Sequence, residues 1–247
     1  MASKKIQIRT AEPYAWPHDA CFSPSTTAFI IIDMQRDFCE PGGYLSSQGY
    51  DISSTRAIIP ALQALLQAFR TANFPIYHTR EGHRPDLSTL PRRERYRSGV
   101  IPGSLPIGTH GPLGRLLVRG ERGHAHIAEL APAEDGSEPV VDKPLRSAFA
   151  HTDLDLMLRV RGVKCLVIAG VTTDVCVKST MTDANDHGYD CLLVGDACAA
   201  AEKGLHEAVL KSVAGEGGIF GAVAEWKDVV EVVKSWEQYE HETGNCN

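Results

Sequence analysis

Apolar and polar positions along the chain follow two recurring patterns. One is a short continuous apolar run, as expected of a strand buried on both faces of a parallel sheet. Such runs occupy residues 27–32, 75–79, 163–169 and 191–194, with a shorter β-rich run at 140–143. The other places apolar residues three and four positions apart, which predicts amphipathic helices at 58–72, 153–161, 178–187, 202–214 and 227–239. Because strands and helices alternate, the pattern predicts an α/β fold with a three-layer, doubly wound (Rossmann-like) and mostly parallel sheet.

The same pattern divides the chain into an arm, a domain and a tail. Residues 1–26 hold three prolines among aromatic residues, which predicts an extended arm on the surface. Residues 27–239 are predicted to form a single domain, and residues 240–247 a polar C-terminal tail. Between residues 80 and 139 prolines and glycines interrupt the pattern, so we expect long loops that cover the substrate at an edge of the sheet.

Composition narrows the class of protein. With 247 residues, 43% of them hydrophobic, the chain can bury a full core, and its net charge of −6 argues against nucleic acid or an anionic membrane as a partner. The apolar runs are too short to cross a bilayer, and the N-terminus lacks the apolar stretch of a secretory signal. The seven cysteines are scattered without a CxxC pair, which predicts no disulfide framework and a cytoplasmic, reducing location.

Three chemically active residues follow predicted strands. Cys176 comes after the strand at 163–169, where the next helix should begin, so backbone N–H groups and the helix dipole would favour its thiolate. Asp33 follows the first strand, and Lys143 ends the run at 140–143. In an open parallel sheet, these positions border one crevice at the carboxyl edge. The alternatives are a buried structural cysteine at Cys176 and a helix cap or turn residue at Asp33.

Together these groups suit nucleophilic acyl transfer. The Lys143 ammonium would stabilise the Cys176 thiolate and lower the pKa of the thiol. Asp33 would accept the thiol proton and pass it to the departing amine. Backbone N–H groups of Thr172 and Cys176 would form an oxyanion hole.

The chain resembles the isochorismatase-like cysteine hydrolases, which share an Asp-Lys-Cys triad. The matching segments, spread over about residues 27–222, are 29–35, 142–144 with 147–149, 170–177, 183–184 and 195–196. The resemblance implies that Asp33, Lys143 and Cys176 are catalytic and that the Val171–Thr172 peptide bond is cis. It also implies a homo-oligomer, specifically a homotetramer, with no cofactor.

Differences between this chain and two groups of relatives narrow the range of possible reactions. Isochorismatases proper lack the nucleophilic cysteine, so Cys176 favours hydrolysis of a C–N bond. Nicotinamidases bind a metal through an Asp-x-His motif, whose positions are matched here to Ala72 and Phe74, and we therefore expect no metal. The histidines are interpreted as surface or packing residues; they are His78, His83, His124 and His126.

Three segments, 13–17, 78–86 and 217–221, resemble the biuret hydrolase branch, which acts on urea-type carbonyls like the related ureidoacrylate amidohydrolases. That branch has a Lys and a Gln where this chain has Arg146 and Glu216. These two residues either bind the substrate, together with Phe38, or pair with each other. Arginines at 92, 93, 95 and 97 suggest anion binding, although Glu94 among them favours a solvated face or a subunit contact.

The sequence thus predicts a metal-independent cysteine amidohydrolase of a small, biuret-like ureide or amide that forms a thioester-type acyl-enzyme and releases ammonia. One alternative is a hydrolase of a carboxylated substrate, such as ureidoacrylate or an N-carbamoyl amino acid. Another is a non-catalytic family member that acts as a binding or scaffold protein.

Overall fold

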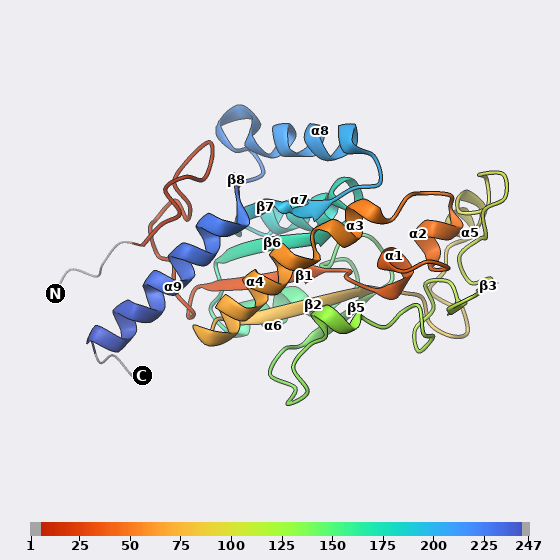
Figure 1. The fold of residues 1–247 in the computed structure, drawn as a ribbon, viewed down its shortest axis with the longest axis horizontal. Helices are drawn as coiled ribbons and strands as arrows, with labels where there is room; N and C mark the ends of the chain where they lie inside the picture. Colours follow the sequence, from red (N-terminus) through yellow and green to blue (C-terminus); the bar gives the residue numbers. More distant parts are fainter. Residues whose placement is uncertain (1–5, 244–247) are drawn as a thin grey trace.

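The computed structural model describes residues 6–243, and within them six parallel strands form one sheet (Figure 1). Across the sheet the strands are ordered β5-β2-β1-β6-β7-β8. Their bounds are β1 Thr27–Ile32, β2 Ile76–Glu81, β5 Val140–Lys143, β6 Cys165–Val171, β7 Asp190–Ala199 and β8 Ala222–Ala224. The predicted α/β fold with a doubly wound parallel sheet is confirmed.

Helices cover both faces of the sheet. In Figure 1, α4 (Ile59–Thr71) and α9 (Trp226–Thr243) lie in front of it, and α6 (Leu154–Val160) and α7 (Lys178–Asp186) lie behind. Helix α8 (Lys203–Ala214) connects β7 to β8. The shorter elements are α1 Arg36–Cys39, α2 Tyr44–Ser47, α3 Ser53–Ala57, α5 Arg92–Arg97, β3 His110–Gly111, β4 Gly114–Arg115 and the single turns η1 Ala128–Leu130, η2 Thr173–Val177 and η3 Gly215–Gly217.

The two central strands explain why the sheet forms. Every residue of β1 and of β6 is buried, and the two strands pair in register from Thr27 and Cys165 to Ile32 and Gly170. Burying such continuous apolar runs on both faces requires a helical layer on each side. The strand order reverses between β1 and β6, so the crevice at their carboxyl ends is the usual ligand position of such a sheet.

Strand bounds differ from the sequence predictions at the carboxyl edge. The prediction for β1 is correct, whereas β2, β6 and β7 run beyond their predicted ends, to Glu81, Val171 and Ala199. Gly170 and residues 195–197 therefore lie within β6 and β7. A glycine is needed at Gly170, where a Cβ would lie 2.2 Å from the Ile32 carbonyl oxygen.

The N-terminal arm is anchored more deeply than predicted. Trp16 and Phe22 are 0% and 2% exposed, and Phe22 packs against Phe74 with ring centroids 4.9 Å apart. The arm also turns back on itself, since Ile8 and Trp16 form an antiparallel bridge. At the other end, α9 extends beyond the predicted helix, and the tail positions 244–247 lie outside the described residues.

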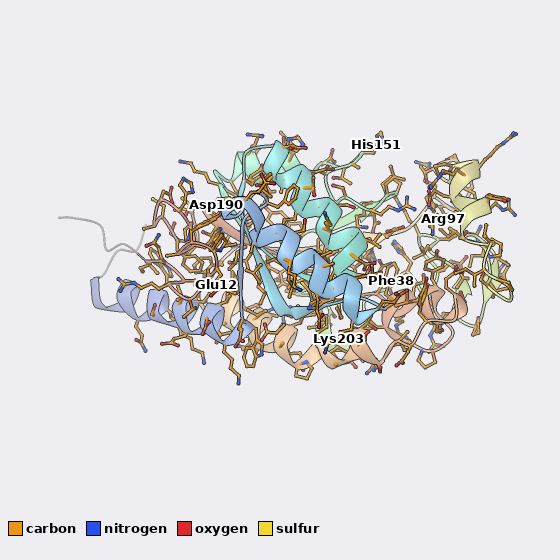
Figure 2. All side chains as sticks on the ribbon, turned by 90° about the horizontal axis from the view of Figure 1, so that it is seen from above. Glu12, Phe38, Arg97, His151, Asp190 and Lys203 are labelled. Carbon is orange, nitrogen blue, oxygen red and sulfur yellow. The ribbon has the colours of Figure 1, made fainter. Side chains whose placement is uncertain are left out.

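The carboxyl and amino ends of the strands, called here the carboxyl and amino edges of the sheet, lie toward opposite ends of the molecule. Figure 2 shows Phe38 and Arg97 toward one end and Glu12 and Asp190, the first residue of β7, toward the other. Within residues 6–243, no helix has the length and apolar character required to span a bilayer.

Candidate active site

Four side chains meet where β1, β2, β5 and β6 end. Asp33 follows β1, Glu81 and Lys143 are the last residues of β2 and β5, and Cys176 lies in the turn after β6. All four are buried. The structure therefore brings the three residues predicted as catalytic together and adds a fourth, Glu81.

Lys143 is the centre of this cluster. Its Nζ lies 2.7 Å from Asp33 Oδ2, 3.2 Å from Glu81 Oε2 and 3.5 Å from Cys176 Sγ, and it donates to the Leu145 carbonyl oxygen at 3.0 Å. An ammonium removed from water in this way is stabilised only because two carboxylates surround it.

Asp33 is held in one orientation. Its Oδ1 accepts a hydrogen bond of 2.6 Å from the Thr79 hydroxyl, while Oδ2 faces Lys143. The backbone N–H of Asp33 donates to the same Thr79 oxygen at 3.1 Å. Asp33 has a φ of 50°, in the left-handed region, where a non-glycine residue is uncommon and often functional.

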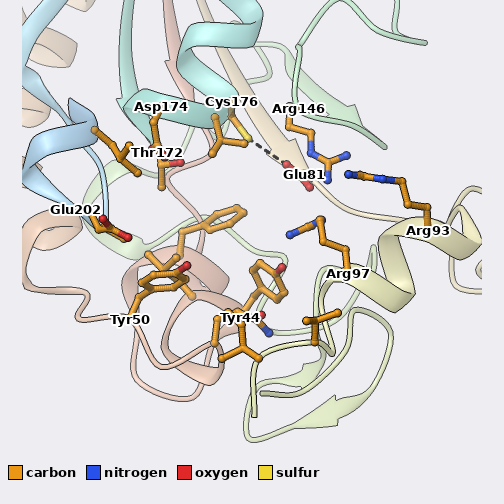
Figure 3. Close-up of a pocket in the computed structure, with 18 of the residues that line it drawn as sticks. Tyr44, Tyr50, Glu81, Arg93, Arg97, Arg146, Thr172, Asp174, Cys176 and Glu202 are labelled. Atoms are coloured by element: carbon orange, nitrogen blue, oxygen red, sulfur yellow. Dashed lines mark hydrogen bonds between the residues drawn. The ribbon is translucent and has the colours of Figure 1, made fainter. Parts of the chain in front are cut away.

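Glu81 was missed by the sequence reasoning. Its Oε2 accepts a hydrogen bond from Cys176 Sγ at 3.1 Å, and its backbone N–H donates to Gln35 Oε1 at 2.7 Å (Figure 3). A signal was present, because Glu81 follows the second apolar run much as Asp33 follows the first. The predicted strand stopped at Thr79, yet β2 also includes the charged residues Arg80 and Glu81.

Burial and charge set the protonation of the cluster. Burial, reinforced by Glu81 and Asp33, raises the pKa of the Cys176 thiol well above its usual value, although Lys143 acts in the opposite direction. Lys143 lowers the pKa of the thiol, as predicted, but the opposite effect of burial is larger. Burial raises the pKa of Asp33. Burial acts in the same direction on Glu81, but Lys143 and the hydrogen bond from the thiol prevail and lower the pKa of Glu81. The resting nucleophile is thus a thiol that needs a proton acceptor in contact with it.

The turn after β6 positions the nucleophile. The Val171–Thr172 peptide bond is cis, and residues Thr173–Val177 form a single π-helical turn that leads into α7. The backbone N–H groups of Val175 and Val177 both donate to the Thr172 carbonyl oxygen at 3.1 Å. Thr172 and Cys176 therefore lie at the two ends of one tight turn, where backbone N–H groups can bind an oxyanion.

A pocket of about 740 Å³ opens onto Cys176. Apolar and aromatic side chains line much of it, among them Phe38, Tyr44 and Tyr50. In Figure 3 the guanidinium groups of Arg93, Arg97 and Arg146 approach the site from the side of Glu81. Such a pocket suits a small organic molecule with an apolar part and polar groups.

Arg146 and Arg97 are held by one carboxylate, Glu94 of α5. Arg146 Nη2 forms a close ion pair with Glu94, and Arg97 Nη2 lies 3.0 Å from the same Oε2. Burial opposes ionisation, but the contacts with Arg146 and Arg97 prevail and lower the pKa of Glu94 to about 2. Arg93 and Arg97 of this arginine-rich segment line the pocket, and the Arg93 side chain is also 77% exposed.

Glu216 lies at the opposite edge of the sheet. It is exposed, belongs to η3 after α8, and precedes β8, whose first residue Ala222 pairs with Leu192 near the start of β7. The expectation that Glu216 borders the pocket is therefore wrong, as is its pairing with Arg146. A segment that precedes a parallel strand meets the sheet at its amino edge, away from the nucleophile.

The positions matched to metal ligands also lie elsewhere. Ala72 follows α4 and Phe74 precedes β2, so both are at the amino edge and say nothing about a metal near Cys176. Asp33, Glu81 and Cys176 do place three possible ligand atoms within 4.8 Å of one another. Since the Lys143 ammonium lies against both carboxylates, however, a cation of the protein's own already neutralises this group.

The histidines lie inside the structure rather than on its surface. His78, His83 and His124 are buried, and His126 is partly buried. His78 Nε2 is 2.9 Å from Glu138, and His83 Nδ1 is 3.0 Å from the Thr89 carbonyl oxygen. Of the two interpretations, packing is the correct one for these residues.

Known proteins are similar to this chain in sequence and in fold. The isochorismatase domain family matches residues 27–228. The ureidoacrylate amidohydrolase RutB of Methylobacterium radiotolerans is 32% identical over 210 residues, covering 81% of this chain and 77% of that protein. A similar enzyme of Methylorubrum extorquens is 30% identical over 217 residues, with 81% and 80% covered. A crystal structure of a cysteine hydrolase from Pseudomonas syringae pv. phaseolicola has a TM-score of 0.74 and 29% identity, covering 96% of this chain and 100% of that one.

Proposed function

We propose that this chain, which belongs to the isochorismatase family, is a cysteine amidohydrolase that cleaves a C–N bond of a small ureide or amide with release of ammonia. The observation that carries the proposal is the Cys176 thiol at the base of a pocket, in contact with both Glu81 and the Lys143 ammonium. The similarity to enzymes named ureidoacrylate amidohydrolase supports the same reaction class.

In the proposed reaction, Asp33, Lys143 and Cys176 act together. The carbonyl oxygen of the substrate accepts hydrogen bonds from the backbone N–H groups of Thr172 and Cys176, which stabilise the tetrahedral intermediate. Cys176 Sγ attacks the carbonyl carbon, the amine leaves, and a thioester-type acyl-enzyme remains for water to hydrolyse. Lys143 stabilises negative charge on sulfur, and Asp33 holds Lys143 in place.

The pocket favours a substrate that carries a carboxylate. Arg97 and Arg146 both line it and share the Glu94 carboxylate, and the acidic residues Glu81, Asp174 and Glu202 line it too. A guanidinium binds a carboxylate through two parallel N–H groups. A neutral, biuret-like ureide remains the second candidate, but Glu216, expected to accept from its NH2 group, is absent from the pocket-lining residues that the structure describes.

Ammonia release from a substrate panel tests this proposal. The panel pairs biuret with ureidoacrylate, and N-carbamoylglycine with N-carbamoylglycinamide, which lacks the carboxylate. We expect turnover that depends on Cys176 and a higher kcat/KM for the carboxylated member of each pair. No turnover of any compound would favour the binding or scaffold alternative, whereas equal rates for the parent and Cys176→Ala would show that Cys176 is not the nucleophile. A preference for biuret would restore the neutral ureide as the substrate.

We also propose that the protein is a homo-oligomer and that it is located in the cytoplasm. A homo-oligomer, specifically a homotetramer, is consistent with exposed apolar side chains near the pocket mouth, such as Tyr96 and Val100. Sedimentation velocity would measure the assembly. A cytoplasmic location is supported by free thiols at Cys39, Cys165, Cys191 and Cys198.

A further inference from the structure

We infer that the pocket over Cys176 contains an apolar subsite, which binds a bulky aliphatic or aromatic group of the substrate. This inference deepens the proposed amidohydrolase function and rests on it, because it names the substrate class. The substrate is a ureide or amide that carries such a group close to its scissile C–N bond. The observation behind the inference is that exposed apolar side chains gather around the pocket that contains the nucleophile.

Exposed apolar side chains are concentrated at this pocket. Of the ten large hydrophobic side chains that are exposed among the described residues, six line it. They come from separate parts of the chain and are called here the apolar rim: Tyr50, Tyr96, Val100, Ile101, Val175 and Leu205. Exposure of apolar side chains to water is unfavourable, and their concentration in one place marks a binding surface.

The apolar surface continues from the rim toward the nucleophile. Phe38 and Tyr44 are buried and line the same pocket. In Figure 3, Tyr44 and Tyr50 lie across the pocket from Thr172 and Cys176. A substrate whose carbonyl group contacts Cys176 therefore faces apolar side chains on the opposite wall.

The pocket is also larger than a small ureide requires. A water molecule takes up about 30 Å³ of the liquid, so a molecule with as few non-hydrogen atoms as biuret fills roughly 200 Å³. The pocket has a volume of about 740 Å³, which is the size that accommodates a much larger ligand. Because much of its wall is apolar, a substituent that fills the remaining space is stabilised by the burial of apolar area.

A second copy of the chain is the rival occupant of the apolar rim. Tyr96 belongs to α5 and Val100 follows it, so an oligomer contact at the pocket mouth would cover both. An interface at the mouth does not fill a cavity that reaches Cys176, however, and buried Phe38 and Tyr44 extend the apolar surface into that cavity. These observations favour a small apolar group of the substrate.

Two N-carbamoyl amino acids that differ only in their side chain test the subsite. N-carbamoylphenylalanine carries a benzyl group where N-carbamoylglycine has hydrogen, and both keep the ureide and the carboxylate. Ammonia release gives kcat/KM for N-carbamoylglycine and for each enantiomer of the phenylalanine derivative. The better enantiomer should exceed N-carbamoylglycine about 10- to 100-fold, as expected for the burial of one aromatic side chain. A ratio near or below one would refute the inference.

Matched serine variants locate the subsite. Val100→Ser and Leu205→Ser each remove apolar groups from the rim and should lower this ratio about 3- to 10-fold. Val160→Ser and Leu156→Ser are the controls, because both residues are exposed on α6 and neither is among the described residues that line the pocket. Their ratios should stay within about twofold of the parent. A parental ratio in all four variants, or an equal fall in all four, would rule out the rim as the subsite.

Sedimentation velocity of the same variants tests the rival occupant. If Val100→Ser or Leu205→Ser dissociates an oligomer while the ratio stays parental, the rim belongs to an interface with a second copy and the inference fails. A lowered ratio with unchanged assembly supports the subsite.

Failure of this inference can be told apart from failure of the proposed function. If the parent hydrolyses both compounds at similar rates and Cys176→Ala hydrolyses neither, the amidohydrolase function holds and the apolar subsite fails. If the parent hydrolyses neither compound, the proposed function fails, and isothermal titration calorimetry then measures the binding of both compounds to the parent and to Val100→Ser. Tighter binding of the phenylalanine derivative, weakened in Val100→Ser, would support the subsite. Equal binding of the two compounds, or no binding, would refute it.

Discussion

Glu81 and Lys143 are register partners at the last positions of β2 and β5, with Oε2 and Nζ 3.2 Å apart. Successive side chains of a strand point to opposite faces, so a one-residue slip of either strand would separate this pair. The parallel register therefore places a cation beside a carboxylate that is 62 positions away in the chain. The same carboxyl edge holds Asp33 and Cys176, which makes the ends of four strands the basis of the site.

Cys176 should carry the covalent intermediate. Cys176→Ala and Cys176→Ser should lower kcat/KM by more than about 10³-fold while the fold persists, since nothing else in the cluster is as nucleophilic as sulfur. Cys21 is exposed and will also react with iodoacetamide, so labelling should be followed in a Cys21→Ser background. Loss of activity there should track alkylation of Cys176, read by peptide mass spectrometry. Inactivation that instead follows Cys39 or Cys198 would refute the assignment.

Activity should survive exhaustive chelation. The Lys143 ammonium already lies against Asp33 and Glu81, so a divalent ion at this position would have to displace a buried cation. Dialysis against EDTA should leave kcat within about twofold of the untreated enzyme, whereas a metal-dependent hydrolase loses its nucleophilic water with the ion. Elemental analysis of the dialysed protein is the control. Activity that returns only with added zinc, manganese or iron would overturn this expectation.

Arg146 and Glu216 should differ sharply in their effect on catalysis. Arg146 lines the pocket, and losing one of its hydrogen bonds in a desolvated site costs about 1–3 kcal/mol. Arg146→Ala should therefore lower kcat/KM on a carboxylated substrate about 5- to 150-fold. Glu216→Ala, a charged-to-alanine change at an exposed site on the far edge, should stay within about twofold of the parent. Equal losses in the two variants would show that Glu216 reaches an active site, as an oligomer contact could allow.

Asp37 should make stability depend on pH. Burial raises the pKa of Asp37 from 3.8 to about 6, although the backbone N–H groups of Leu117 and Tyr44 oppose this shift. A carboxyl with a raised pKa binds its proton more tightly in the folded state, so its contribution is largest at low pH and is lost as the pH rises through about 6. Between pH 4.5 and 7.5 this group alone should remove about 2 kcal/mol from the free energy of unfolding.

Urea denaturation of the parent and of Asp37→Asn at both pH values measures this effect. The stability of Asp37→Asn relative to the parent should increase from pH 4.5 to 7.5, because the variant has no carboxyl to ionise. The comparison cancels contributions from the other titrating groups. A difference between the two proteins that is independent of pH would contradict the raised pKa.

Local pattern was enough to predict most of the sheet and its helices. The run at 27–32 is β1 to the residue, and the predicted helix at 58–72 differs from α4 by one residue at each end, because apolar periodicity reflects which faces are buried. The placement of Asp33, Lys143 and Cys176 at one edge followed from the same pattern, since parallel strands end together. Strand ends were less predictable where a charged side chain is buried, as at Glu81.

The sequence alone therefore determined the fold class, the parallel sheet and three of the four residues at its carboxyl edge. Only the tertiary structure decided that Glu81 contacts the thiol, that Glu94 holds Arg146, and that Glu216 lies at the opposite edge. The physical reason is that the burial of a strand or helix depends on residues close together in the chain, and periodicity records it. Contacts between side chains of different strands and loops depend on register and on how long loops cross the edge. A single sequence carries no periodic signal for either.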